Sequence, residues 1–168
     1  MHLENIGLYL LLAVATHICY ADVTKFATSN PPAGGLSAED GKVLRDSSHF
    51  REVRYTHDLP PAIIALCAGD GGKIADPSQK WNATDAIIDP TLPGKRLIWA
   101  AVGGDYYVVH YERGGIVHTY HVLVAKVMNG TAKPKVVWSA VGGPFEDYTA
   151  FVDALRTEKL DDRMDYAD

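Results

Sequence analysis

Five histidines beyond residue 21 are the side chains best suited to acid–base chemistry: His49, His57, His110, His118 and His121. An imidazole titrates near neutral pH, so it can act as a general base or as a metal ligand. His121 with Tyr106 is one candidate catalytic pair, His118 with Ser139 is another, and His110 is a further candidate base. No nucleophile elbow or other catalytic motif accompanies them, so the catalytic assignment stays open.

The spacing of these histidines does not predict a metal site. His118 and His121 are three residues apart in an expected strand, so they point to opposite faces of the sheet. His110 and His121 are expected to share a face, but they lie diagonally, and the spacing encodes no third ligand. We therefore expect neither a metal nor a cofactor.

Three further motifs are better explained by structure than by chemistry. Cys67 lies in the apolar run PPAIIALCAG, which is typical of a small buried residue. The stretch GDGGK (69–73) looks like a phosphate-binding loop, but it lacks the GxxxxGK[ST] spacing and a preceding strand. The Asn-x-Thr sequences at Asn82 and Asn129 accept glycans only in a eukaryotic secretory context, and Asn129-Gly130 is also typical of a turn.

The elements that position these side chains are clearest after residue 95. Four segments rich in β-branched and aromatic residues are separated by dipeptides that favour two-residue hairpin turns. We therefore expect a four-stranded antiparallel meander over about 95–141. Its turns are expected at Gly103-Gly104, Gly114-Gly115 and Asn129-Gly130.

Helices are expected to pack on this meander, which makes the fold class α+β. The segment 59–68 begins with prolines that suit a first helical turn, and a glycine that can end a helix follows it. The C-terminal segment 144–158 begins with Pro144 and has one apolar stripe along its length. A shorter helix is expected from Ser37 to about Arg45, because a serine followed by acidic residues favours a helix start.

Counting outward from the expected turns sets the register of the strands. The count places four side chains in one row across the sheet: Trp99, Val108, His121 and Trp138. The repeated W-[AS]-A-V-G-G motif thus supplies two tryptophans to one face, which we expect to form the core. The opposite face carries the candidate ligand-binding residues Tyr107, Tyr111, His118, Tyr120 and Ser139, which combine apolar area with polar tips. The alternative is that the irregular segment 69–96 simply covers that face.

The first 21 residues resemble a secretory signal peptide, because an apolar run is followed by smaller residues that end at Ala21. The run is shorter than the roughly 20 apolar residues of a transmembrane helix, so we expect no transmembrane segment. The remaining chain divides into three expected parts: a flexible leader (22–36), a single α+β domain (37–160) and an acidic tail (161–168).

Charge and motifs together favour a binding protein. The formal net charge is −5 and no basic run occurs, which argues against a nucleic-acid partner. The leading hypothesis is a secreted or periplasmic small protein that binds another protein, in the manner of an inhibitor, or a small ligand. The alternative is a small secreted or periplasmic hydrolase or isomerase with a pocket histidine as general base. It requires an open pocket with His110 or His121 beside a tyrosine, a serine or a carboxylate.

Overall fold

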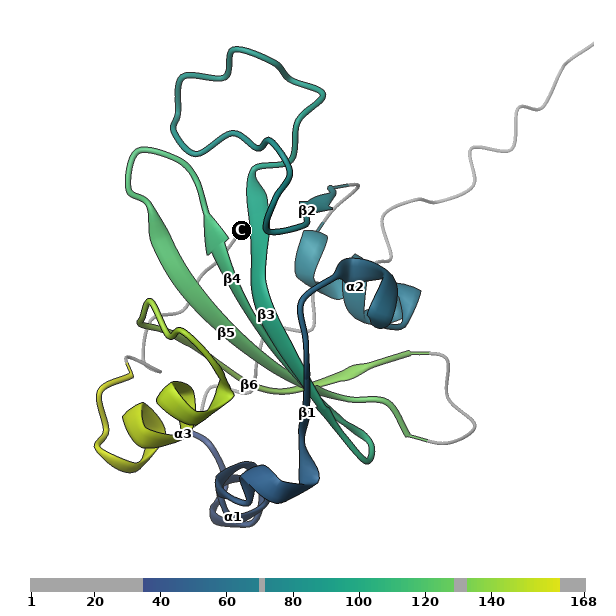
Figure 1. Ribbon diagram of the computed structural model, residues 1–168, viewed down its shortest axis with the longest axis vertical. Coiled ribbons are helices and arrows are strands. Elements are labelled where there is room, and N and C mark those ends of the chain that lie inside the picture. Colours follow the sequence, from purple (N-terminus) through teal and green to yellow (C-terminus); the bar gives the residue numbers. More distant parts are fainter. Residues whose placement is uncertain (1–34, 70–71, 129–132, 161–168) are drawn as a thin grey trace, which may run out of the picture.

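The structure is a computed structural model that describes residues 35–69, 72–128 and 133–160. The predicted signal peptide, most of the predicted leader, the Asn129-Gly130 turn and the predicted acidic tail lie outside the described residues. Within the described ranges the fold is α+β, as predicted, with three α-helices and a largely antiparallel sheet (Figure 1). In this part of the chain no helix has both the length and the apolar character needed to span a membrane.

The sheet has the spatial order β1-β3-β4-β5-β6, and β2 also pairs with β3. Its strands are β1 (Arg51–Val53), β2 (Ile74–Ala75), β3 (Lys95–Gly103), β4 (Tyr106–Arg113), β5 (Thr119–Lys126) and β6 (Lys135–Val141). The predicted meander corresponds to β3–β6 and is confirmed. The predicted number of strands is too small, because β1 pairs antiparallel with the second half of β3 and β2 pairs parallel with its first half. These two short strands provide backbone partners for an outer strand of the meander.

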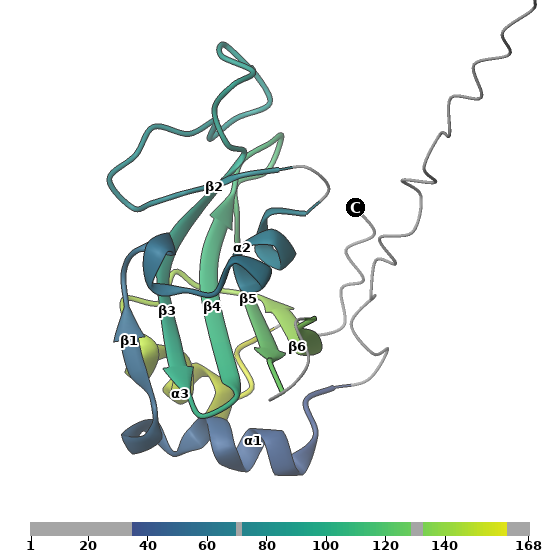
Figure 2. The same ribbon diagram turned by 90° about the vertical axis from the view of Figure 1, so that its right-hand side faces the viewer.

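Helices cover both faces of the sheet (Figure 2). They are α1 (Ala38–Arg45), α2 (Pro61–Ala68) and α3 (Tyr148–Arg156). α1 and α3 pack on one face, over a core that contains both Trp99 and Trp138. α2 packs on the other face, where Ile63 and Cys67 join a second core. Burial raises the pKa of the Cys67 thiol to about 12, so the prediction of a buried structural cysteine is confirmed.

The first predicted turn is displaced by one residue. Gly103 pairs with Tyr106, so the two-residue loop is Gly104-Asp105 rather than Gly103-Gly104. Gly104 has a φ of 61°, which suits a glycine in a tight turn. Gly103 is needed within the strand, because a Cβ there would lie 2.8 Å from the backbone oxygen of His49. The two glycines therefore serve different purposes.

The second predicted turn is wrong in length, and this changes the face that β5 presents. Arg113 pairs with Thr119, so the loop between β4 and β5 spans residues 114–118 instead of two residues. When a loop has an odd instead of an even number of residues, every side chain of the following strand points to the other face of the sheet. As a result Val124, rather than His121, faces the tryptophan core. The observed row across the sheet is Ala101, Val108, Val124 and Trp138.

The backbone of Phe145 joins the sheet to α3. The indole N–H of Trp99 donates to the Phe145 carbonyl at 2.9 Å, and the Phe145 N–H donates to Nε2 of His110 at 3.2 Å. Because both backbone groups of this residue bond to the sheet, they are not available to a helix. The helix predicted over 144–158 accordingly begins only at Tyr148.

Candidate functional site

The predicted ligand-binding side chains do not share one face of the sheet. Tyr107, Tyr111 and Ser139 lie on the side that α2 covers, whereas Tyr120 lies on the opposite side, opposite Glu112. The reversed alternation of β5 is the physical reason for this division. The remaining member, His118, lies in the loop between β4 and β5. The expectation of a single face rich in tyrosine is therefore wrong. The side of Tyr107 is covered by α2 together with Ile74 of β2, which lies within the segment 69–96.

His110 is a core residue whose two ring nitrogens are both bonded within the protein. It is fully buried, its Nδ1 donates to the His121 carbonyl at 2.9 Å, and its Nε2 accepts from the Phe145 N–H. Desolvation by burial lowers its pKa to about 4, which keeps the ring neutral. A general base must present a nitrogen to its substrate, so the geometry of His110 is structural.

The predicted pair of His121 and Tyr106 does not form. The His121 ring stacks on Tyr111 with a centroid separation of 5.1 Å, and its Nε2 lies 2.8 Å from the Thr119 hydroxyl. Tyr106 lies on the opposite face, where its hydroxyl donates to Asp40 at 2.6 Å. The two side chains therefore cannot act on one substrate.

His118 is the predicted site residue that has a carboxylate partner. Its Nε2 lies 2.7 Å from Oε2 of the buried Glu112, whose other oxygen accepts from Nε of Arg96. Trp81 packs against both partners, with its ring centroid 5.0 Å from the Arg96 guanidinium and 5.5 Å from the His118 ring centroid. The long loop (76–94) is thereby fastened, through Trp81, to β3 and to the loop that follows β4.

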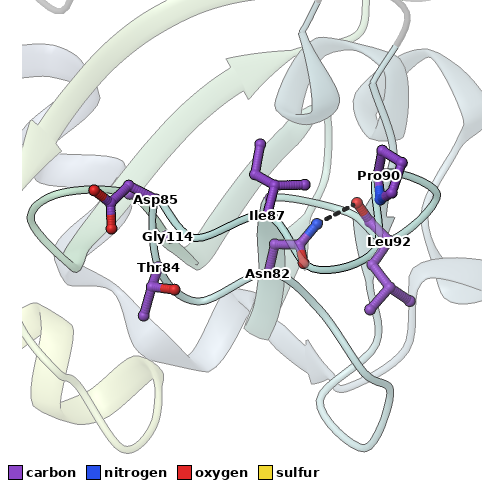
Figure 3. Close-up of a pocket in the computed structure, with 9 residues that line it drawn as sticks. Asn82, Thr84, Asp85, Ile87, Pro90, Leu92 and Gly114 are labelled. Carbon is purple, nitrogen blue, oxygen red and sulfur yellow. Dashed lines mark hydrogen bonds between the residues drawn. The ribbon is translucent and has the colours of Figure 1, made fainter.

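The long loop extends beyond one end of the sheet and is held by its own hydrogen bonds (Figure 1). The Asn82 side-chain amide donates to the carbonyls of Asp89 at 2.9 Å and Leu92 at 3.2 Å, and the second of these bonds is drawn in Figure 3. These bonds cross the loop from one arm to the other. The residues between Asn82 and Leu92 are thus held as a closed loop.

The long loop also contacts the β4–β5 loop directly. Thr84 forms an isolated parallel bridge with Gly115. Gly114 packs so closely that a Cβ there would lie 2.1 Å from the backbone oxygen of Asn82. A cavity of about 260 Å³ remains between the loops (Figure 3). It is smaller than the roughly 300–1,000 Å³ of typical small-molecule sites, so we assign it to the loop junction.

The two joined loops expose four large aliphatic side chains, named the loop surface: Ile87, Ile88, Ile116 and Val117. Their exposed fractions are 64%, 94%, 89% and 68%, respectively. Single exposed apolar residues are ordinary on a protein surface, but a group of them on adjoining loops is typical of an interaction site. The loop surface is therefore the candidate functional site.

The sequence carries a signal for the loop surface, but half of it falls in a segment that the sequence predicts to be a strand. Ile87 and Ile88 are an apolar break within the polar segment 69–96. Ile116 and Val117 read as the start of a strand, because they continue directly into an apolar run. Since β5 begins only at Thr119, these two residues fall in the loop instead.

Comparison of the chain with models of protein families, with curated proteins and with solved structures gives no match in any of the three. Among the described residues, no three side chains of His, Cys, Asp or Glu gather as metal ligands.

Proposed function

We propose that this chain is an exported protein that binds a partner protein through the loop surface, in the manner of an inhibitor. The exposure of four aliphatic side chains on two joined loops carries the proposal. Burying such side chains against a partner yields about 25 cal/mol per Å² of apolar area removed from water. Ile88 and Ile116 are nearly fully exposed, so they are the side chains with the most to gain from a partner.

The bracing of the two loops supports this proposal. Asn82 ties the arms of the long loop together, and the contact of Gly114 joins that loop to its neighbour. A segment that is already held in its bound shape loses less conformational entropy when a partner binds. Loops on a rigid scaffold are also where proteins commonly carry their binding residues.

A protein partner fits the loop surface better than a lipid membrane. Membrane-surface sites combine apolar residues with a basic flank that attracts anionic lipids, and aromatic residues are typical there. The loop surface is aliphatic, and the exposed Asp85 lies two residues from Ile87. Arg113 lies three residues from Ile116, so the flank carries both signs of charge rather than a basic run, which suits the polar rim of a protein interface.

The hydrolase or isomerase alternative has less support from the same geometry. It needs His110 or His121 beside an open pocket. Both nitrogens of His110 are bonded within the core, and His121 lies on the opposite face from its expected partner Tyr106. Neither of the two cavities at this end of the sheet is lined by a histidine.

The binding proposal is tested with a photoreactive residue at position 88 or 116 of the full chain in its native host. Both positions are expected to cross-link to the same protein. With that protein purified, Ile88→Asp and Ile116→Asp are each expected to weaken binding at least tenfold, roughly the effect of changing one central interface residue. Met128→Asp is the matched control, because Met128 is 54% exposed outside the two loops and its change should leave binding unaltered.

A second pair of variants tests the bracing. Gly114→Ala places a methyl group against the Asn82 backbone, whereas Gly94→Ala meets no atom within 4 Å. Only Gly114→Ala should weaken binding of the partner protein. Binding that both aspartate variants leave unchanged would overturn the proposal. Flotation with lipid vesicles that depends on Ile88 and Ile116 would replace the protein partner with a membrane.

Export is tested separately from binding. If residues 1–21 are a signal peptide, the mature protein from the native host should begin at Asp22, with the loss of the apolar run before it. N-terminal sequencing of the purified mature chain, together with fractionation of cells and medium, measures this. A chain that keeps Met1 and stays in the cytoplasm would contradict export but not the use of the loop surface.

A further inference from the structure

The long loop presents one aliphatic side chain between two short turns. The loop projects beyond one end of the sheet (Figures 1 and 2), and Ile88 within it is 94% exposed. Before this residue the Ile87 N–H donates to the Asp85 carbonyl at 3.0 Å, and after it the Leu92 N–H donates to the Asp89 carbonyl at 3.2 Å. Ile88 is therefore an exposed side chain on a backbone that hydrogen bonds restrain on both sides.

The backbone that follows Ile88 is held by the opposite arm of the loop. The Asn82 side-chain amide donates to the carbonyl of Asp89, the next residue, at 2.9 Å. Asn82 is itself fixed, because its backbone N–H donates to the Pro93 carbonyl at 2.8 Å. The Asp89 carboxylate accepts from the N–H and the hydroxyl of Thr91, at 2.9 and 2.6 Å. A cut in the chain after Ile88 would therefore leave Asp89 held in place by other bonds.

These features suit the active-site cleft of a proteinase. A serine proteinase binds its substrate with a primary pocket that receives the side chain before the bond to be cut. A projecting loop brings an exposed side chain to such a pocket, and a restrained loop loses less conformational entropy when it enters. Pairs of proteinase and inhibitor are among the tightest complexes of ordinary interface size, and their backbones move little on binding. An aliphatic residue such as Ile88 fits a proteinase whose primary pocket is apolar.

We propose that the long loop enters the active-site cleft of a serine proteinase and places Ile88 in an aliphatic primary pocket. This inference rests on the proposed function, because it names the class of partner that the loop surface binds. The adjoining loop adds Ile116 and Val117 to the contact, since the bridge between Thr84 and Gly115 joins the two loops. The second loop matters because interfaces of this kind bury about 800 Å² on each partner, which is more than one side chain supplies.

The proposal predicts that the peptide bond after Ile88 is cut only slowly. The serine oxygen of the proteinase attacks the Ile88 carbonyl carbon, the bond to the Asp89 nitrogen breaks, and that nitrogen takes the serine proton through the enzyme's histidine. Water then hydrolyses the ester between Ile88 and the enzyme, which leaves a carboxylic acid and returns a proton to the serine. Because Asn82 keeps Asp89 in place, the new amine stays beside the ester and re-forms the peptide bond in competition with water.

Elastase is the probe enzyme, because its small primary pocket takes aliphatic side chains, and trypsin is the control enzyme, because its pocket carries an aspartate. In assays with a chromogenic peptide substrate, the full natural chain is expected to inhibit elastase and not trypsin. Ile88→Asp should weaken the inhibition of elastase at least tenfold. Ile88→Lys should weaken it equally and should gain at least tenfold against trypsin, because a lysine pairs with the aspartate of that pocket. Lys80→Gln changes another exposed residue of the long loop and should alter neither inhibition.

Mass spectrometry after incubation with elastase tests the role of Asn82. Asn82→Ala removes the side-chain bonds to the carbonyls of Asp89 and Leu92, so cleavage after Ile88 should be at least tenfold faster than in the natural chain. Circular dichroism shows whether this variant keeps the fold. If it does not, Ile88→Lys still tests the proposal, because it changes only an exposed side chain.

The failure of this inference differs from the failure of the proposed function. The inference is overturned if the natural chain does not inhibit elastase, if Ile88→Lys gains nothing against trypsin, or if elastase cleaves the natural chain as fast as Asn82→Ala. A native partner that cross-links at positions 88 and 116 and is not a proteinase would also overturn it and would leave the loop surface standing. Partner binding that Ile88→Asp and Ile116→Asp both leave unchanged would overturn the proposed function instead.

Discussion

Replacing Trp99 with alanine is expected to lower the free energy of unfolding by about 3–5 kcal/mol, the usual range for removing a buried aromatic side chain. Trp99 is fully buried, and its ring packs against Tyr148 and Phe151 of α3. The change also removes the indole N–H that the Phe145 carbonyl accepts. Because small domains are stable by only about 5–15 kcal/mol, the loss is large. Urea denaturation followed by circular dichroism measures it.

Two further variants identify the origin of that loss. Trp99→Phe keeps most of the buried ring and removes only the indole N–H, so it should cost about 1–3 kcal/mol through the unpaired Phe145 carbonyl. Trp81→Ala is the control, because Trp81 is a half-buried indole of the long loop that packs on Arg96, and its loss should stay near 1 kcal/mol or less. A loss below 1 kcal/mol for Trp99→Ala would contradict its central place in the core.

The role of the two repeated tryptophans could be predicted from sequence, although the register that supported it was wrong. Trp99 and Trp138 do share one core, as expected. The loop after β4 reverses the alternation of β5, and the pairing of Val124 with Trp138 reverses it again in β6. These two register errors cancel at Trp138 of β6, which therefore lies on the expected face. They leave β5 with its two faces exchanged. This is why the tryptophans were placed correctly and His121 was not.

Local irregularities explain most of the other differences. A bulge between Leu97 and Trp99 puts these two residues on opposite faces, although they are two apart in a strand. The role of Gly103 depends on how closely His49 approaches it, and no local pattern encodes such a contact between distant residues. Composition therefore predicted where the strands lie, whereas the face that each residue occupies depended on single residues in turns and bulges.

The candidate site was harder to predict than the fold for the same reason. The loop surface depends on the contact of Gly114 with Asn82, which joins two loops that no periodicity connects. What sequence did offer was the residue type, since Ile88 is an aliphatic side chain in an otherwise polar segment.

Lowering the pH from 7 to 4 is expected to reduce the free energy of unfolding by about 3 kcal/mol through His110 alone. Burial lowers the pKa of His110 in the folded state to about 4, whereas the ring titrates near 6.5 in the unfolded chain. Between these values the unfolded chain binds a proton that the folded chain does not. The stabilisation is therefore fully present above pH 6.5 and is lost as the pH falls toward 4. Urea denaturation at half-unit steps of pH measures this slope.

Carboxylates act in a lower range of pH and can be separated from this effect. Hydrogen bonds from Ser48 and Thr91 lower the pKa values of Asp46 and Asp89, respectively. A carboxylate with a lowered pKa keeps its contribution above its usual pKa of 3.8 and loses it only below that value. The slope between pH 6.5 and 4 therefore lies above the range in which these two carboxylates act, and the variant His110→Gln tests its assignment to His110.

His110→Gln keeps one donor and one acceptor at this position but no group that titrates in this range. We expect this variant to have a lower free energy of unfolding than the natural protein at pH 7. Because that free energy should stay nearly constant down to pH 4, the values for the two proteins should converge in acid. His57→Gln changes an exposed ring and should keep the natural slope. A slope in His110→Gln equal to the natural one would place the acid sensitivity elsewhere. Nε2 of His110 accepts a hydrogen bond from the Phe145 N–H, so a proton on that nitrogen would place two donors against each other. As the pH falls, hydrogen exchange of the Phe145 amide should therefore speed up before that of other core amides.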